Sequence, residues 1–133
     1  RLGELILAQK SPDLLAEIEK LPCVPGERWS REHHLTGFSE GQITAELARR
    51  WDFPSEMVQA LNAATQPMSA LPYSRLAAVV HLAGLLADMP EVGPAAIDEL
   101  PGEVVAALQL KPQWMKDKLP DPATFLDVGD LSC

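Results

Sequence analysis

Residues 31–87 decide the fold: REHHLTGFSEGQITAELARRWDFPSEMVQALNAATQPMSALPYSRLAAVVHLAGLLA. Apolar residues recur here at intervals of three and four, as in helices that bury one face. Leu47 and Trp51 follow this spacing, and Ser39 with Gln42 three residues later is a capping-box signature for a helix start. An alternating strand pattern and hairpin pairs such as Asn-Gly are missing from the sequence. The stretch therefore predicts consecutive α-helices.

Proline and glycine breaks divide the rest of the chain into further helical segments. The expected helices span residues 2–7, 12–21, 27–36, 40–51, 54–66, 75–87, 101–110 and 112–119, with a linker at 90–94. The segment 75–87 is apolar on nearly all sides, so we expect it to be the central buried element. We expect Met57, Leu61 and Ala64 on the inner side of their helix, and Trp51, Leu61 and Leu82 buried in one cluster.

The length of 133 residues suits one domain with a hydrophobic core. The sequence predicts an all-α bundle of about six to eight short helices over residues 1–119, followed by an acidic, poorly ordered tail at 120–133. The chain begins with Arg1 at the edge of an apolar run, formed by Leu2, Leu5, Ile6 and Leu7. We expect this to be the C-terminal part of a larger domain. The apolar run would then be covered by the N-terminal half of the same chain or by a second copy in a homodimer.

Charge and cysteine content exclude several classes of protein. The net charge of −8 gives no electrostatic attraction to nucleic acid or to an anionic membrane. The longest near-apolar run, Leu76 to Ala87, falls short of the ~20 residues that span a bilayer. The two cysteines, Cys23 and Cys133, do not form a disulfide framework, which fits a reducing compartment. We therefore expect a cytoplasmic location.

The three histidines are not spaced as metal ligands. His33 and His34 are adjacent, so on a helix they point about 100° apart, and we expect both to be solvated. His81 has only Ala, Gly and Leu three and four positions away, which favours a packing role. Because a zinc or iron site needs three or four converging ligands, the sequence predicts no metal, no cofactor and no catalytic residue.

Two short patterns have structural interpretations. Gly37-Phe38-Ser39-Glu40-Gly41 matches the letters of a serine nucleophile elbow, but that motif needs a preceding strand, and none is expected here. Ser39 is therefore interpreted as a helix cap. The pair at 49–50, Arg-Arg, is interpreted as a solvated helix end rather than a nucleic-acid contact.

Four motifs in order resemble the C-terminal half of an HDOD domain. They are Leu2-Gly3-x-Leu5-Ile6-Leu7, Glu32-x4-Gly37, Leu47-x3-Trp51-x-Phe53-Pro54 and, after Pro67, Val80-His81-Leu82-Ala83-x-Leu85-Leu86-Ala87. HDOD domains are non-catalytic relatives of the HD metal-dependent phosphohydrolases and occur in bacterial signalling proteins. The resemblance places the ligand positions of such a hydrolase at Arg1, Ser39-Glu40, Ala64-Thr65 and Gly84. Ala64 and Gly84 have no donor atom, and Arg1 carries a positive charge.

The resemblance implies a regulatory output module that binds a signalling protein partner through protein–protein contacts. One candidate contact surface is the acidic region that contains Glu91, Asp98, Glu99 and Glu103. Three alternatives stay open, and the first two are a divergent HD phosphohydrolase whose ligands lie upstream of Arg1 and a nucleotide or small-molecule sensor that uses the vestigial pocket. An unrelated helical domain is the third.

Overall fold

The computed structural model describes residues 2–20 and 26–121, and over these residues the chain is helical without a strand. Its elements in order are α1 (Leu2–Lys10), α2 (Pro12–Glu19), α3 (Glu27–Thr36), α4 (Glu40–Arg50), α5 (Ser55–Ala63), the 3₁₀ helix η1 (Pro67–Ser69), α6 (Arg75–Asp88), the 3₁₀ helix η2 (Pro94–Glu99), α7 (Gly102–Ala107) and α8 (Pro112–Lys118). The all-α class is confirmed. The two 3₁₀ helices were not predicted. Of the expected acidic tail at 120–133, only residues 120 and 121 are described. Both cysteines, Cys23 and Cys133, lie outside the described residues.

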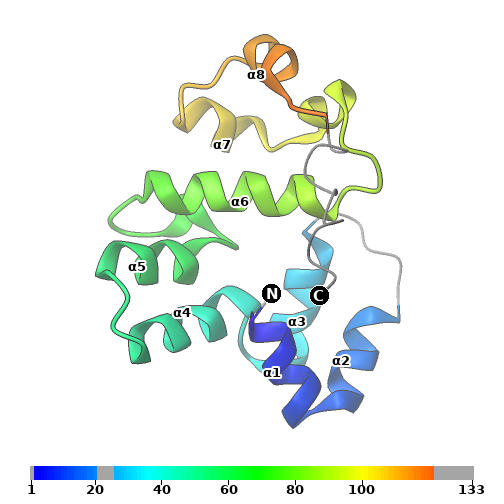
Figure 1. Cartoon of the computed structure of the whole chain (residues 1–133), viewed down its shortest axis with the longest axis vertical. Coiled ribbons are helices and arrows are strands. Elements are labelled where there is room, and N and C mark those ends of the chain that lie inside the picture. The colour runs from blue at the N-terminus through cyan, green and yellow to red at the C-terminus, as the bar shows by residue number, and fades with distance from the viewer. Residues whose placement is uncertain (1, 21–25, 122–133) are drawn as a thin grey trace, which may run out of the picture.

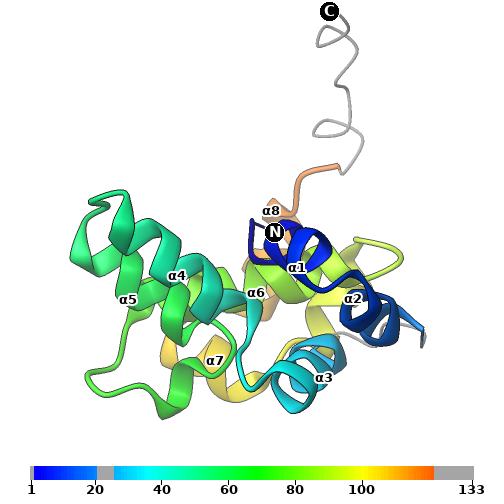
Figure 2. The ribbon, with the colours of Figure 1, turned by 90° about the horizontal axis from the view of Figure 1, so that it is seen from below.

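Helix α6 runs through the middle of the molecule (Figure 1). Helices α4 and α5 lie on one side of it, and η2, α7 and α8 lie on the other. Helix α5 packs on both α4 and α6, α1 packs on α4, and α2 joins α1 to α3. Seen from below, α3 lies at the end of α6 away from the α4–α5 corner (Figure 2). No helix in the described ranges is long and apolar enough to cross a bilayer.

Local capping explains where the central helices begin and end. The Ser39 hydroxyl accepts from the Gln42 backbone N at 3.4 Å, and the Gln42 side chain accepts from the Ser39 backbone N at 2.9 Å. Both halves of the predicted capping box are therefore present. Ser74 likewise accepts from the Ala77 backbone N at 3.2 Å at the start of α6. Helix α3 ends at Gly37, whose φ of 76° is the left-handed conformation that glycine adopts without strain.

The main core lies between α6 and the C-terminal elements η2 and α7. Its buried members are Ala78, Leu82, Leu85, Met89, Ala96, Ile97, Leu100, Val104, Val105 and Leu108. This confirms that 75–87 is a central helix and that Leu82 is in the core. The helix is not buried on every side, however, because Leu76 and Val79 near its start are exposed.

Small residues let α4, α5 and α6 pack closely. The buried residues at these contacts are Ala45 and Ala48 of α4, Ala60 of α5, Ala64 at its end, and Ala77 of α6. Gly41 marks the closest approach, since a Cβ added there would lie 2.6 Å from the backbone oxygen of Leu61. The buried side chains of α5 and its end are therefore alanines.

The prediction that Trp51 is buried was wrong. Trp51 is 56% exposed, and Met57 is also exposed, whereas Leu61 is only partly buried. Trp51 is the C-cap residue of α4, with φ −93° and ψ 13°. Because its backbone is no longer helical, its side chain does not continue the apolar face on which Leu47 lies. Met57 belongs to the first turn of α5, just beyond the same corner. The inner face of α5 is formed by Ala60 and Ala64 instead.

Candidate functional site

The positions that the resemblance aligns with hydrolase ligands lie together in the fold. Glu40 at the start of α4, Ala64 and Thr65 after α5, and Gly84 in α6 all line one cavity of about 230 Å³. Arg1 lies outside the described residues. Four positions spread over 45 residues of sequence therefore meet at one place, as the motif order implied.

Trp29 occupies space at this cavity that a side chain on α6 would need. A Cβ added to Gly84 would lie 3.1 Å from Cζ2 of the Trp29 indole. Trp29 also lines the cavity, and its ring packs on His81 with centroids 5.2 Å apart. A side chain at position 84 would therefore be tightly packed against the indole, which would have to shift by a few tenths of an ångström.

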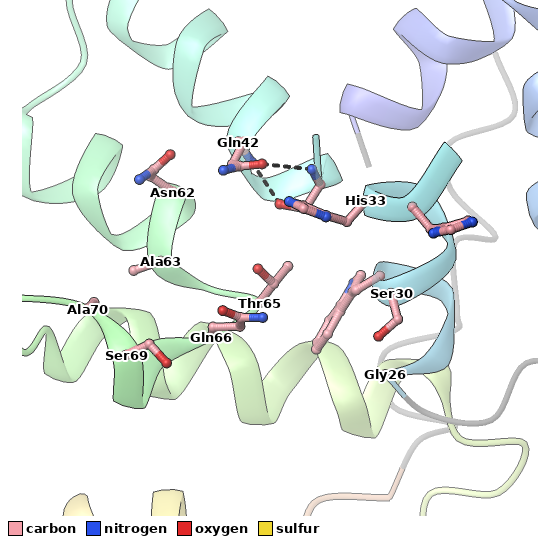
Figure 3. A pocket seen from close by; sticks show the side chains of 13 residues that line it. Gly26, Ser30, His33, Gln42, Asn62, Ala63, Thr65, Gln66, Ser69 and Ala70 are labelled. Carbon is pink, nitrogen blue, oxygen red and sulfur yellow. Dashed lines mark hydrogen bonds between the residues drawn. The ribbon is translucent and has the colours of Figure 1, made fainter. Parts of the chain in front are cut away.

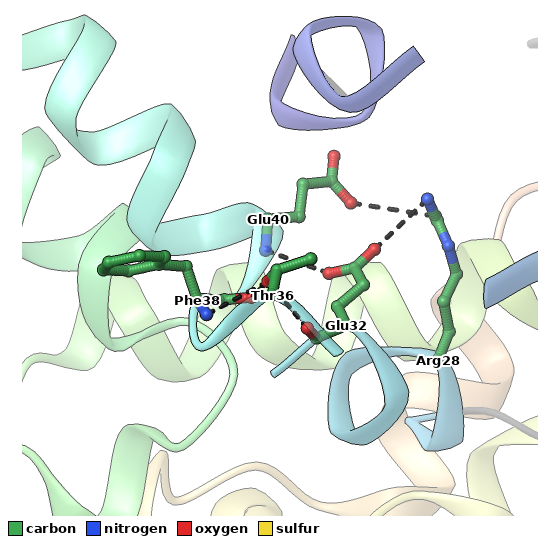
Figure 4. A network of polar contacts seen from close by, with 5 residues as sticks. All are labelled: Arg28, Glu32, Thr36, Phe38 and Glu40. Carbon is green, nitrogen blue, oxygen red and sulfur yellow. Dashed lines mark hydrogen bonds and ion pairs between the residues drawn. The ribbon is translucent and has the colours of Figure 1, made fainter. Parts of the chain in front are cut away.

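A buried arginine supplies the positive charge of the site. Arg28 is 4% exposed and lines the same cavity. Its Nη2 lies 3.3 Å from Oε1 of Glu32, and its Nη1 lies 3.7 Å from Oε2 of Glu40 (Figure 4). Glu32 is 0% exposed. Because a buried charge is tolerated only when it is paired, the three side chains depend on one another.

Glu32 also holds the start of α4. Its Oε2 accepts a hydrogen bond from the backbone N of Glu40 at 2.9 Å. The first backbone N–H groups of a helix have no partner within the helix and favour negative charge, so a carboxylate suits this position. The Thr36 hydroxyl lies 2.7 Å from the carbonyl oxygen of Glu32 and 2.6 Å from that of Phe38, and accepts from the Phe38 backbone N (Figure 4). The turn between α3 and α4 is therefore fixed by polar contacts.

The residues at this cavity do not fit a divalent cation. Ala64 and Gly84 offer no side-chain donor atom, and the guanidinium of Arg28 already pairs with the carboxylates of Glu32 and Glu40. In the part of the chain that the structure describes, no group of three or more His, Cys, Asp or Glu side chains could hold a metal ion. A cation would have to enter beside a fixed positive charge, which electrostatics opposes.

The histidines behave as the sequence predicted. His33 and His34 are exposed. His81 is half-buried, and its Nδ1 lies 2.7 Å from the carbonyl oxygen of Ala64, so neutral imidazole with its proton on Nδ1 donates there. Burial lowers the pKa of His81, while the bond to Ala64 and the charge of Glu103 oppose this shift. Its packing role between α6 and the end of α5 is confirmed.

The other singled-out polar residues also have structural roles. Ser39 is buried as a helix cap, which confirms that interpretation. Arg49 and Arg50 are exposed at the end of α4 and pair with Glu46 at 2.7 Å and 2.9 Å. Hydrogen bonds from Arg49 and then Arg50 lower the pKa of Glu46 to about 2. This pairing confirms the solvated helix end.

The acidic surface that the sequence suggested is partly neutralised. Glu91, Asp98, Glu99 and Glu103 are all exposed. Asp98 forms an ion pair with Nζ of Lys116 at 2.7 Å, which ties η2 to α8. At least one of the four acids, Asp98, therefore stabilises the fold through an ion pair.

Sequence reasoning missed Arg28 and Trp29. Both lie on α3, for which the sequence predicted only a helix over residues 27–36. The spacing of Arg28 and Glu32 was the available signal, because opposite charges four residues apart meet on a helix. The sequence alone gave no sign that this pair is buried.

Comparison with known proteins agrees with the motifs. The family model of the HDOD domain matches residues 1–67, which is 67 of the 133 residues. The match spans α1 to the start of η1 and includes Glu40, Ala64 and Thr65, whereas Gly84 lies beyond it. No curated protein and no solved structure matched the chain. The family match covers half of the chain, and the chain therefore belongs to the HDOD family.

Proposed function

We propose that this HDOD chain is a non-catalytic regulatory module that acts through protein–protein contacts in a bacterial signalling protein. The observation that supports this proposal is the guanidinium of Arg28, placed between Glu32 and Glu40 at the cavity where a hydrolase would hold its metal. A site with a built-in cation pairs both carboxylates without a metal ion. Such a site stabilises the fold but has no activated water. A cytoplasmic location belongs to the same proposal.

Exposed aromatic side chains at the α4–α5 corner support the protein-contact part of the proposal. Trp51 and Phe53 are both exposed, and their rings lie 6.3 Å apart. Aromatic residues are enriched at the centres of protein interfaces, where they contribute most of the binding energy. We propose this aromatic corner, Trp51 with Phe53, as the contact surface for a signalling partner.

Metal content tests the non-catalytic part. We expect zinc, iron and manganese well below one equivalent in protein purified without chelators, and background hydrolysis of phosphodiester substrates. The competing function is a divergent phosphohydrolase with additional ligands from outside this chain. Stoichiometric metal in the full-length protein, with hydrolysis that Glu40→Gln abolishes, would establish that alternative.

Partner capture tests the contact surface. The full-length protein carrying Trp51→Ser and Phe53→Ser should lose a partner that the wild-type protein retains, with circular dichroism and melting temperature unchanged. Trp114→Ser is the matched control, because Trp114 is equally exposed but lies on α8. Equal retention of the partner by all three proteins would show that the aromatic corner is not the contact surface.

A further inference from the structure

A second cavity lies beside the first and is larger, at about 530 Å³. Its lining residues come from α3, the start of α4, the end of α5 and η1: Gly26, Trp29, Ser30, His33, His34, Ser39, Gln42, Asn62, Ala63, Thr65, Gln66, Ser69 and Ala70. It shares only Trp29 and Thr65 with the cavity of the former ligand positions. Its volume falls in the range of ~300–1,000 Å³ that small-molecule sites occupy.

The lining is polar but carries no Lys, Arg, Asp or Glu among its described residues. A phosphate or carboxylate would therefore have no arginine or lysine to bind it, and a metal ion would have no carboxylate. What the lining offers instead is a set of hydrogen-bonding groups from amides, hydroxyls and the imidazoles of His33 and His34. Its chemistry suits an uncharged ligand with several hydrogen-bonding groups.

Two amides are available to such a ligand. The side chains of Asn62 and Gln66 are both exposed and both line the hollow, and within the described residues neither makes a side-chain hydrogen bond to protein (Figure 3). Each amide presents a donor beside an acceptor. Gln42 uses its oxygen to accept from the Ser39 backbone N, which leaves its amide hydrogens for a third contact. The indole of Trp29 adds an aromatic surface to the same lining.

We propose that this cavity binds a small, uncharged, planar nitrogen heterocycle of the nucleobase or nucleoside class. Paired donors and acceptors on an amide match the edge of such a ring, and the Trp29 indole provides an apolar wall against it. A bound ring would contact both α3 and the end of α5. Ligand binding would thereby stabilise the α3–α5 arrangement, giving the domain an input that does not depend on the protein-contact proposal.

Trp29 can be made the only reporter of binding. The chain has three tryptophans, and both Trp51 and Trp114 are exposed, so Trp51→Phe with Trp114→Phe should leave the fold intact. The single indole N–H signal in a nitrogen-labelled NMR spectrum then belongs to Trp29. Titration with adenine, guanine, cytosine, uracil and their nucleosides should give a saturable shift of this signal for at least one of them.

Variants in the cavity locate the site. In calorimetry, Asn62→Leu and Gln66→Leu should each weaken binding by about tenfold or more, because each leaves a polar edge of the ligand unpaired. Gln59→Leu is the matched control, since Gln59 is an exposed amide on α5 that does not line this cavity. Melting temperatures of the variants without ligand should equal that of the wild type.

Three results would overturn the proposal. The first is no shift of the Trp29 signal with any base or nucleoside at millimolar concentration. The second is equal weakening by Gln59→Leu. The third is binding of nucleoside phosphates without binding of nucleosides, which would indicate an anion site elsewhere. None of these results bears on metal content or on partner capture, so the two proposals fail separately.

Discussion

Arg28 carries the positive charge of a buried acidic cluster. Its guanidinium lies 3.3 Å from Glu32, which is fully buried and also accepts from the backbone N of Glu40. Removing only the cation would break a buried ion pair of this carboxylate, and such changes cost about 3–5 kcal/mol. We therefore predict that Arg28→Met lowers the free energy of unfolding in urea by that amount.

Combining Arg28→Met with Glu32→Gln should recover much of this loss, because glutamine is neutral and its oxygen can still accept from the Glu40 N. Arg49→Met is the control for an exposed ion pair and should cost at most about 1 kcal/mol. A loss below about 1 kcal/mol for Arg28→Met would show that Arg28 does not stabilise the acidic cluster.

His81 predicts a pH dependence of stability. Burial lowers its pKa, so near the usual value of about 6.5 the unfolded chain binds more protons than the folded chain. The contribution of His81 to stability is therefore present above the unfolded pKa and is lost as the pH falls toward the lowered folded pKa. His81→Asn keeps a donor for the Ala64 carbonyl but cannot titrate.

The wild type should consequently lose more unfolding free energy than His81→Asn between about pH 7.5 and about pH 5.5. Denaturant unfolding at several pH values measures this difference. Parallel pH profiles for the two proteins would contradict the role assigned to His81.

At the scale of elements, local signals located the helices but not all of their faces. The capping box at Ser39, the cap at Ser74 and the stop at Gly37 act within one turn of chain, so the sequence determines them directly. Which side of a helix is buried depends on where its partner lies. The burial of Trp51 was predicted wrongly because α4 ends at Arg50, so the helical spacing of apolar residues no longer determines where the Trp51 side chain lies.

The candidate site likewise contains some residues that the sequence placed correctly and others that it did not. The motif order brought Glu40, Ala64 and Gly84 to one cavity, because helix lengths and breaks fix their relative positions. Arg28 and Trp29 could not be assigned to it from sequence. Both belong to α3, and nothing in a single polar helix shows which of its charges is turned inward.

Gly41 tests the close contact between α4 and α5. A Cβ at this position would lie 2.6 Å from the backbone oxygen of Leu61, and backbone cannot move aside as a side chain can. Overpacking of this kind costs about 1–3 kcal/mol, which exceeds the gain of about 1 kcal/mol in helix propensity. We predict that Gly41→Ala lowers the melting temperature.

Gly102→Ala is the matched control, because a Cβ on this helical glycine would meet nothing within 4 Å. This substitution should leave the melting temperature unchanged or raise it. A higher melting temperature for Gly41→Ala would mean that α4 and α5 are further apart than described.

At the scale of the whole molecule, α6 carries the core that joins the two sides. Leu82 is buried among residues of α6, η2 and α7. Leu82→Ala should lower the free energy of unfolding by about 2–5 kcal/mol, the usual cost of such a cavity. Val79→Ala on the exposed part of the same helix should cost far less. Equal small effects of both changes in urea unfolding would show that α6 is not central.

Apolar exposure near α1 predicts self-association. Leu5 is 66% exposed, and a groove of about 570 Å³ between α1 and α4 includes the apolar side chains of Ile6, Phe38, Ile43 and Leu47 in its lining. Soluble monomers rarely leave extended apolar patches uncovered, and a second copy can cover the same patch in a two-fold dimer. We therefore expect the 133-residue chain to form a dimer at micromolar concentration in light scattering.

Phe38→Ser should shift this equilibrium toward monomer without unfolding the chain, because Phe38 is exposed and makes only backbone hydrogen bonds in its turn. Trp114→Ser removes an equally exposed aromatic ring on α8 and should leave the dimer intact. If the N-terminal half of a longer protein covers the groove instead, the two proteins should differ in oligomeric state. The longer protein would then be a monomer, and only the 133-residue chain would associate. A monomeric mass for both proteins at every concentration would show that the groove between α1 and α4 is stable in water and needs no cover.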